Sequence, residues 1–323
     1  MKINNRDAVE VKEIEKKFKN FVAVNKISFT VGQGEIFGFL GPNGAGKSTT
    51  IRILCGILSP TSGSGHVGGF DIIHQQDRIK QSIGYMSQKF SLYNDLTVEE
   101  NINFYAGIYR IPKAKRKERR DWVLTMAGLD ELRSNLTFTL SGGWKQRLAL
   151  GCAIIHEPQI VFLDEPTSGT DPISRKRFWD LIKMMSKNGV TVFVTTHYMD
   201  EAENCDRIAL MYKGDIIAAG TPRELKTNFM RDEVLQIVVP QPETWLEKLK
   251  RAAQVKDTAL FGAAIHAVTG DMEISISAIK ELFLKSEITN YILTKIQPSL
   301  EDVFVSLIET HDTIHNNHEL HPN

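Results

Sequence analysis

The sequence has 323 residues, 42% hydrophobic and 24% charged, with 39 basic and 39 acidic side chains. That length accommodates two domains, and the balanced charge points neither to nucleic acid as a partner nor to an acidic disordered chain. We expect no membrane-spanning segment, because no window approaches about 20 consecutive apolar residues, and no signal peptide in the polar residues 1–15. The isolated cysteines Cys55, Cys152 and Cys205 predict buried, reduced thiols.

Residues 9–31 alternate polar and apolar side chains, which predicts two or three antiparallel strands. Phe18 and Phe21 lie in this stretch. Periodicity alone favours half-buried strand aromatics, whereas the alternative is that one ring stacks on a purine base.

The next segment carries the clearest motif. An apolar run at 36–40 predicts a buried strand, and residues 49–58 have a helical pattern. Between them, glycines allow backbone N–H groups to turn toward phosphate oxygens, and the helix adds the positive end of its dipole. We expect Lys47 to reach the β- and γ-phosphates and the Ser48 hydroxyl to ligate Mg²⁺. The predicted nucleotide-binding residues are Gly41, Pro42, Asn43, Gly44, Ala45, Gly46, Lys47, Ser48 and Thr49.

A short apolar strand is predicted at 83–86, and the amide of Gln88 follows its end. Residues 96–128 have a helical pattern that opens with a capping-box sequence at 97–100. The basic run at 113–120 is interpreted as a solvated helix face, with a phosphate or lipid contact as the alternative.

A second anion site is predicted where Leu-Ser-Gly-Gly, residues 140–143, opens a helix that runs to residue 155. Small residues at a helix N-terminus leave N–H groups accessible to an anion. Because the first motif already holds one nucleotide, a second phosphate site suggests that two chains share each nucleotide.

Two further strands end in polar residues. The apolar run at 160–164 ends in Asp164 and Glu165, which suit a Mg²⁺ contact and the polarisation of a water molecule, respectively. A turn follows at 169–172. The strand predicted at 190–195 is followed by His197, which therefore lies on the ligand edge of a parallel sheet. A strand pair at 207–212 and 215–219 completes this part.

Composition changes near residues 221–222. Beyond them we predict strands at 233–239, 259–268 and 291–296, alternating with helices at 243–252, 275–285 and 299–308, a small βαβαβα module. The last residues contain His311, His315, His318 and His321 in a polar context, which favours a disordered tail over a metal site. The predicted domains are therefore 1–225, 226–310 and the tail 311–323.

With these pieces in order, residues 9–221 resemble the nucleotide-binding subunit of ABC transporters. The resemblance rests on Walker A at 41–48, the ABC signature at 140–143, Walker B at 160–165 and the switch histidine, His197. Gln88 matches the Q-loop, and 169–172 match the D-loop. The implied fold is an α/β P-loop NTPase: a mainly parallel sheet core, an antiparallel β subdomain and a helical subdomain, with a small C-terminal α+β domain.

The resemblance also implies site roles. Each ATP is held between one chain's P-loop and the signature helix of a second chain, with Phe18 stacking on adenine. Glu165 activates water, His197 contacts the γ-phosphate and Lys47 neutralises it. Trp144 stands where the family has Gln, and Thr170 where Leu or Val is commoner. The residues implied across the dimer are Ser141, Gly142, Gly143 and Asp171, and those implied for Mg²⁺ are Ser48, Gln88 and Asp164.

Within the family, three segments are similar to subunits of ABC-2-type exporters, including multidrug efflux ATPases: 36–40, 195–202 and 300–304. This implies an ATP-hydrolysing subunit, peripheral on the cytoplasmic face of the inner (cell) membrane. The expected partners are separate ABC-2-type permeases, a second ATP-binding subunit of the same sequence and a periplasmic adaptor, with no nucleic acid. The alternatives are an importer subunit, a non-transport ABC ATPase and a regulatory ATP-binding module without turnover.

Overall fold

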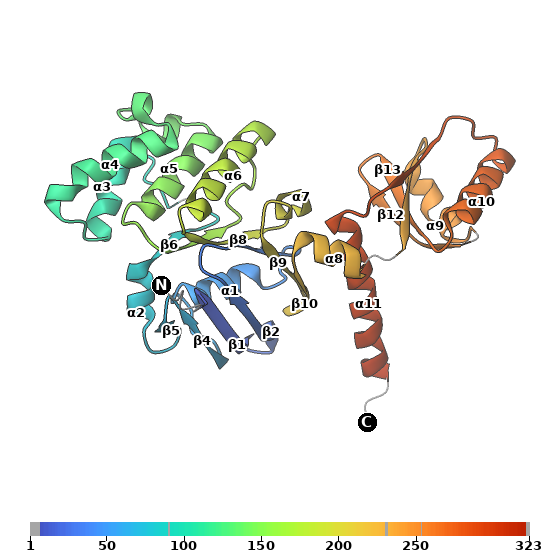
Figure 1. Ribbon diagram of the computed structural model, residues 1–323, viewed down its shortest axis with the longest axis horizontal. Helices are drawn as coiled ribbons and strands as arrows, with labels where there is room; N and C mark the ends of the chain where they lie inside the picture. The colour runs from blue at the N-terminus through green and yellow to red at the C-terminus, as the bar shows by residue number, and fades with distance from the viewer. Residues whose placement is uncertain (1–6, 90, 230–231, 253, 321–323) are drawn as a thin grey trace, which may run out of the picture. The chain divides into compact units, whose positions relative to one another are not determined.

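The computed structural model describes residues 7–89, 91–229, 232–252 and 254–320. The chain divides into two compact units, Met1–Ala219 and Gly220–Asn323. Each unit is described by itself (Figure 1).

Within the described residues, unit 1 is built on a six-stranded sheet with the strand order β10-β9-β3-β8-β7-β6. The pairs β3–β8, β3–β9, β7–β8 and β6–β7 are parallel. Every residue of β3 and β7 is buried, as expected for parallel strands covered on both faces. The predicted, mainly parallel core is therefore confirmed. The strands are β3 (Ile36–Leu40), β6 (Ile83–Met86), β7 (Ile160–Asp164), β8 (Thr191–Thr196), β9 (Arg207–Tyr212) and β10 (Asp215–Gly220).

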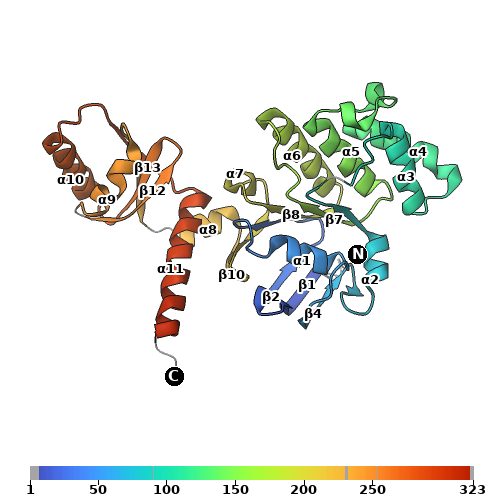
Figure 2. The ribbon, with the colours of Figure 1, turned by 180° about the vertical axis from the view of Figure 1, so that it is seen from behind.

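The predicted antiparallel β subdomain is a second sheet, with the order β2-β1-β4-β5. Its apolar face joins one hydrophobic core with α1 and with the aromatic rings of the parallel sheet, among them Phe37 and Phe193. Figure 2 shows α1 lying between the two sheets. The P-loop, which precedes α1, is thereby held by two sheets. The elements are β1 (Val9–Phe18), β2 (Phe21–Val31), α1 (Lys47–Leu54), β4 (Ser62–Val67) and β5 (Phe70–Asp71).

The helical subdomain has its own apolar core, to which α3, α4 and α5 contribute. The predicted capping box is present: Thr97 and Glu100 satisfy each other's backbone N–H groups at the start of α3. The pattern predicted as continuous over 96–128 is two helices, because Arg110 adopts a positive φ of 54° and Pro112 begins the next helix. The elements are α2 (Gln76–Ser82), α3 (Val98–Ile108), α4 (Lys113–Ala127), η1 (Asp130–Leu132), η2 (Thr137–Thr139) and α5 (Gly142–Ile154).

Two helices follow strands of the parallel sheet. α6 (Pro172–Lys187) follows the turn after β7, and the short α7 (Met199–Ala202) follows β8. Among the described helices, none combines the length and the apolar character needed to cross a bilayer.

Unit 2 differs from the predicted βαβαβα order. Its four described strands form the sheet β12-β13-β11-β14. The single strand predicted at 259–268 is wrong: it is the hairpin β12–β13, turned at Gly262, which has a positive φ of 57°. The apolar run hides this turn because no Asn or Asp accompanies the glycine. The elements are α8 (Pro222–Phe229), β11 (Glu233–Val238), η3 (Pro242–Trp245), α9 (Leu246–Lys250), β12 (Val255–Phe261), β13 (Ala264–Thr269), α10 (Met272–Lys285), β14 (Ile292–Ile296) and α11 (Leu300–Leu320).

The last helix, α11, also differs from expectation. It continues to Leu320, so the segment predicted as a disordered tail from residue 311 is helical to that point. Of the four histidines in the segment, His321 lies outside the described residues. The helix begins with a reciprocal cap between Ser299 and Asp302 and extends without a proline or glycine to stop it.

Candidate functional site

The P-loop lies against neighbouring backbone at two of its glycines. A Cβ on Gly41 would lie 2.1 Å from the carbonyl oxygen of Met211, and one on Gly46 would lie 2.3 Å from that of Ala23. Both glycines have positive φ angles, 155° and 109°, as does Gly44 at 83°. No atom lies within 4 Å of a Cβ built on Gly44. The loop is thus fixed on one side and open at Gly44.

Lys47 is a buried ammonium group. Its Nζ donates hydrogen bonds to the carbonyl oxygens of Gly41 (2.7 Å) and Pro42 (3.1 Å) and lies 3.4 Å from Oε1 of Glu165. Burial lowers the pKa of Lys47, while the carboxylates of Glu165 and Asp164 act in the opposite direction. A lysine held by weakly charged carbonyl groups in a desolvated loop can transfer its hydrogen bonds to phosphate oxygens.

Ser48 and Asp164, whose oxygen atoms are predicted to bind Mg²⁺, are in contact at the end of β7. The Ser48 hydroxyl donates to Oδ1 of Asp164 over 3.0 Å, and Thr195 Oγ1 donates to the same oxygen over 2.8 Å. Asp164 is 1% exposed. A hydroxyl and a carboxylate are the hard oxygen ligands that Mg²⁺ uses when water and phosphate complete its shell. The residues present therefore fit this ion.

Glu165 is the point on which three predicted residues converge. One carboxylate oxygen, Oε2, accepts a hydrogen bond from Gln88 Nε2 (3.0 Å) and lies 3.3 Å from Nδ1 of His197. The other oxygen faces Lys47. The backbone of Glu165 has a φ of 48°, and its N–H donates to both oxygens of Thr195. Such a conformation costs energy for a residue other than glycine, and strained residues of this kind are concentrated at functional sites.

Phe18 lies apart from this cluster, at the end of β1 opposite Phe21. Phe18 is 46% exposed and Phe21 62% exposed, so Phe18 is the half-buried strand aromatic that the alternation predicts, whereas Phe21 is more exposed than predicted. The ammonium group of Lys16 lies 5.2 Å from the centre of the Phe18 ring. An exposed ring at a hairpin turn is accessible to a base, and its stacking role stays a prediction.

The signature residues lie at the start of α5. Ser141 is its N-cap residue, with no hydrogen bond from its side chain to the helix, and Gly142 has open space where a Cβ would lie. A Cβ on Gly143 would lie 2.5 Å from the hydroxyl of Ser174 in α6. Asp171 caps α6 by accepting from the N–H groups of Ile173 and Ser174. A hydrogen bond with the Ser174 side chain lowers the pKa of Asp171 most, and the backbone N–H bonds lower it further. None of these hydrogen bonds involves the P-loop, and the roles of these residues across a dimer stay predictions.

Sequence reasoning missed a buried network behind the turn at 169–172. Thr167 donates to Oε1 of Glu201 (2.5 Å), and Nε of Arg175 lies 3.3 Å from the same oxygen. Glu201 is 1% exposed, and burial raises the pKa of its carboxyl group. The hydroxyl of Thr170, the residue that differs from the common Leu or Val, donates to the carbonyl oxygen of Thr167. The sequence signal for this network was weak: Glu201 is one of two adjacent acids in the polar segment that follows β8.

Trp144, which replaces the usual glutamine, packs against the core of the helical subdomain. Its ring lies 4.4 Å from the guanidinium carbon of Arg147. The substitution therefore extends the packing of α5 and leaves the two glycines before it unchanged.

Comparison with known proteins identifies similar sequences. A family model described as "ABC transporter" matches residues 24–168. The probable multidrug ABC transporter ATP-binding protein YbhF of Escherichia coli is 50% identical over 240 residues, which are 74% of this chain but 40% of that protein. The linearmycin resistance ATP-binding protein LnrL of Bacillus subtilis is 35% identical over 308 residues, 93% of this chain and 97% of that protein. The chain thus spans less than half of the first relative and nearly all of the second.

Among solved structures, the dimeric ATP-binding cassette MJ0796, described as a post-hydrolysis state bound to ADP and Pi, has a TM-score of 0.60 and 27% identity. The match covers 66% of this chain and 98% of that one. The similarity therefore supports the fold seen in unit 1.

Proposed function

The chain belongs to the family of ABC transporter ATP-binding proteins, and from that premise we propose that it hydrolyses Mg-ATP to drive export through separate permease subunits. The main observation in support of this proposal is that Lys47, Gln88 and His197 all contact the carboxylate of Glu165. Phosphoryl transfer depends mainly on positioning and on charge neutralisation, and this arrangement supplies both.

Each side chain has a distinct task in this proposal. Glu165 orients or deprotonates the attacking water, because its carboxylate lies at the end of β7 beside the P-loop lysine. Lys47 and the P-loop N–H groups hold the γ-phosphate. His197 contacts the γ-phosphate and registers its loss, while Gln88 connects the carboxylate to the segment that leads into the helical subdomain.

Ser48 and Asp164 would hold the metal ion, with Gln88 as a further ligand. Mg²⁺ neutralises charge on the phosphates when it is bound. Thr195 keeps the Asp164 carboxylate in place by donating a hydrogen bond to it. Phe18 would stack on the adenine, since its ring is exposed.

The second nucleotide contact comes from another copy of the chain. Ser141 and Gly142 are exposed at the N-terminus of α5, and no hydrogen bond from the Ser141 side chain occupies that helix end. Gly143 and Asp171 lie beside them. A head-to-tail dimer would bring this helix end onto the partner's nucleotide. The similar ATP-binding cassette bound to ADP and Pi is described as dimeric, which supports a dimer.

Export is the direction that the relatives support, since two of them are named for multidrug transport and for linearmycin resistance. The partners would be ABC-2-type permeases at the cytoplasmic face of the cell membrane, with a periplasmic adaptor where the envelope has two membranes. The genes beside this one discriminate between directions: polytopic ABC-2 permeases indicate export, whereas a solute-binding protein indicates import.

The test is the variant Glu165→Gln, which keeps the shape of the side chain and removes its charge. We expect steady-state ATP hydrolysis to fall by about 10²–10⁴-fold, because the water loses its base, while ATP binding is retained. The same variant with Mg-ATP should elute as a dimer in size-exclusion chromatography.

The matched control is Glu131→Gln, which removes the charge of an exposed glutamate in the helical subdomain and should hydrolyse ATP at the wild-type rate. Hydrolysis by Glu165→Gln within a few-fold of wild type would show that another residue activates the water and would overturn the proposal.

A further inference from the structure

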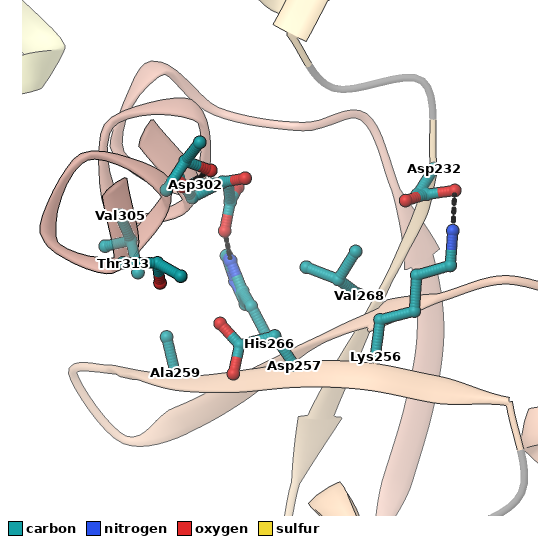
Figure 3. Close-up of a pocket in the computed structure, with 11 residues that line it drawn as sticks. Asp232, Lys256, Asp257, Ala259, His266, Val268, Asp302, Val305 and Thr313 are labelled. Carbon is teal, nitrogen blue, oxygen red and sulfur yellow. Dashed lines mark hydrogen bonds and ion pairs between the residues drawn. The ribbon is translucent and has the colours of Figure 1, made fainter. Parts of the chain in front are cut away.

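The described part of unit 2 contains a hollow of about 430 Å³ that the proposed ATPase does not use (Figure 3). One wall is a face of the hairpin β12–β13, and the other is the first half of α11. A volume of this size lies within the range of small-molecule sites. All the residues that line it belong to unit 2.

A β-bulge shapes the sheet wall. Val255 pairs with Thr269, whereas Asp257 pairs with the adjacent Val268, so one extra residue is inserted in β12. In a regular strand, neighbouring side chains point to opposite faces. Lys256 and Asp257 nevertheless both line the hollow, because the bulge redirects one of them. Bulges that redirect side chains in this way are frequent near functional sites.

A buried pair of side chains, His266 and Asp302, lies at the back of the hollow. His266 Nδ1 lies 2.8 Å from Oδ1 of Asp302, and the two residues are 8% and 4% exposed. Burial acts to raise the pKa of Asp302, but hydrogen bonds from His266 and Ser299 outweigh it, so the pKa is lowered and the carboxylate stays charged. The His266 ring is also stacked on Phe261 at 4.1 Å. The negative charge at the back is therefore fixed in position.

The lining is predominantly anionic. It contains three carboxylates, those of Asp232, Asp257 and Asp302, against the single ammonium of Lys256, which lies 2.7 Å from Asp232 at the rim. Asp257 also pairs with Lys250, whose ammonium nitrogen lies 2.7 Å away and which is outside the lining. Among the side chains that line the hollow, carboxylates outnumber ammonium groups, and this excess favours a cation over a nucleotide or another anion.

The remaining lining is partly apolar and partly hydroxylated. Ala259, Val268 and Val305 supply apolar contacts, and Ser306 and Thr310 of α11 supply hydroxyl groups. Pockets for organic ligands combine an apolar lining with a few placed polar groups in this way.

We propose that this hollow is a binding site for a small organic cation with an apolar body. Asp257 provides the main attraction to the positive charge, the carboxylate of Asp302 adds to it from the back, and the apolar residues of β12, β13 and α11 contact the body of the ligand. Binding requires neither ATP nor its hydrolysis.

The experiment measures the fluorescence anisotropy of ethidium, an aromatic cation, on titration with the full chain in the presence of Mg-ADP. We expect saturable binding that weakens with added salt, and no binding of the anionic dye fluorescein. Asp257→Asn should raise the Kd about tenfold, because the neutral side chain keeps its shape but loses its charge. Ala259→Phe should abolish binding by filling the hollow.

The matched control is Glu281→Gln, which also removes a carboxylate paired with a lysine, but on the exposed face of α10. It should bind ethidium like the wild type. Thermal unfolding of each variant checks that it is folded. If Asp257→Asn is unfolded, the binding of ethidium by Ala259→Phe tests the proposal instead. Absence of saturable binding by the wild type, or binding by Ala259→Phe equal to that of the wild type, would overturn the proposal, whatever the ATPase assay gives.

Discussion

At the scale of single residues, the environment of Glu165 sets its chemistry. Its carboxylate has two short polar contacts and faces a buried lysine, and its backbone occupies a left-handed conformation. The sequence indicated a pair of acids at a strand end. The family resemblance implied that Gln88 and Asp164 share Mg²⁺, but no local pattern connected Gln88 with the Glu165 carboxylate, which lies 77 positions further along the chain.

Thr195 is the residue that fixes both acids, and it supplies a first prediction. Its buried hydroxyl accepts from the N–H of Glu165 (3.0 Å) and donates to Asp164 (2.8 Å). Thr195→Val should lower the free energy of unfolding by about 1.5–3 kcal/mol, because a bond to a buried carboxylate is lost. Denaturation in urea measures the change.

Thr191→Val is the matched control on the same strand. Its buried hydroxyl accepts from the neutral N–H of Gly34 over 2.9 Å, so its loss should cost only about 0.5–1.5 kcal/mol. Equal costs for the two variants would argue against a special role for Thr195.

The cysteines illustrate a residue-scale prediction that is confirmed. Cys55, Cys152 and Cys205 are all free and buried. Burial raises the pKa of each thiol well above its ordinary range, which keeps the groups protonated and unreactive.

At the scale of elements, the two adjacent glycines at the start of α5 differ in the space available for a side chain. Gly142→Ala should be tolerated, because its Cβ meets no atom within 4 Å. Gly143→Ala should lower the free energy of unfolding by about 1–3 kcal/mol, because its Cβ would overlap Ser174 of α6 at 2.5 Å. Thermal unfolding of the two variants measures the difference.

The double variant Gly143→Ala/Ser174→Gly separates this explanation from a general loss of helix quality. Removing the Ser174 side chain should restore part of the lost stability. If the double variant is no more stable than Gly143→Ala, the predicted contact between α5 and α6 is not the cause.

The hairpin β12–β13 shows where element prediction from sequence fails. The mostly apolar stretch at 259–268 predicts one strand, whereas Gly262 turns it into two. Antiparallel pairing then places His266 opposite Ala259 and builds one wall of the hollow. Periodicity could not reveal this arrangement, because the turn carries a single weak signal.

At the scale of the whole molecule, the pH dependence of the free energy of unfolding tests whether His156 is buried in its neutral form. His156 stacks on Tyr109 at 3.7 Å, and burial lowers the pKa of His156 to about 4. The unfolded chain takes up a proton near the ordinary value of 6.5, whereas the folded chain does not until about 4. Stability conferred by neutral His156 is therefore lost as the pH falls from 6.5 to 4.

We accordingly expect His156→Phe, which keeps a ring against Tyr109, to lose less stability over this pH range than the wild type. The difference should be about 1–2 kcal/mol, less than the full linkage value because His156 is partly exposed. Urea unfolding of unit 1 across the range measures it. The control is a Phe substitution at the exposed His74, and a slope for His156→Phe equal to that of the wild type would contradict the prediction.

By itself, the sequence determined the P-loop, the signature segment, the two acids at the end of β7 and the mainly parallel core. These features depend on local backbone geometry and on runs of neighbouring side chains, which a sequence displays directly. Only the tertiary structure decided that Gln88, Glu165 and His197 meet, that Gly143 packs on Ser174, and that unit 2 encloses an anionic hollow. Each of these depends on contacts between distant segments, and the free energy of such contacts is set by packing rather than by any local pattern.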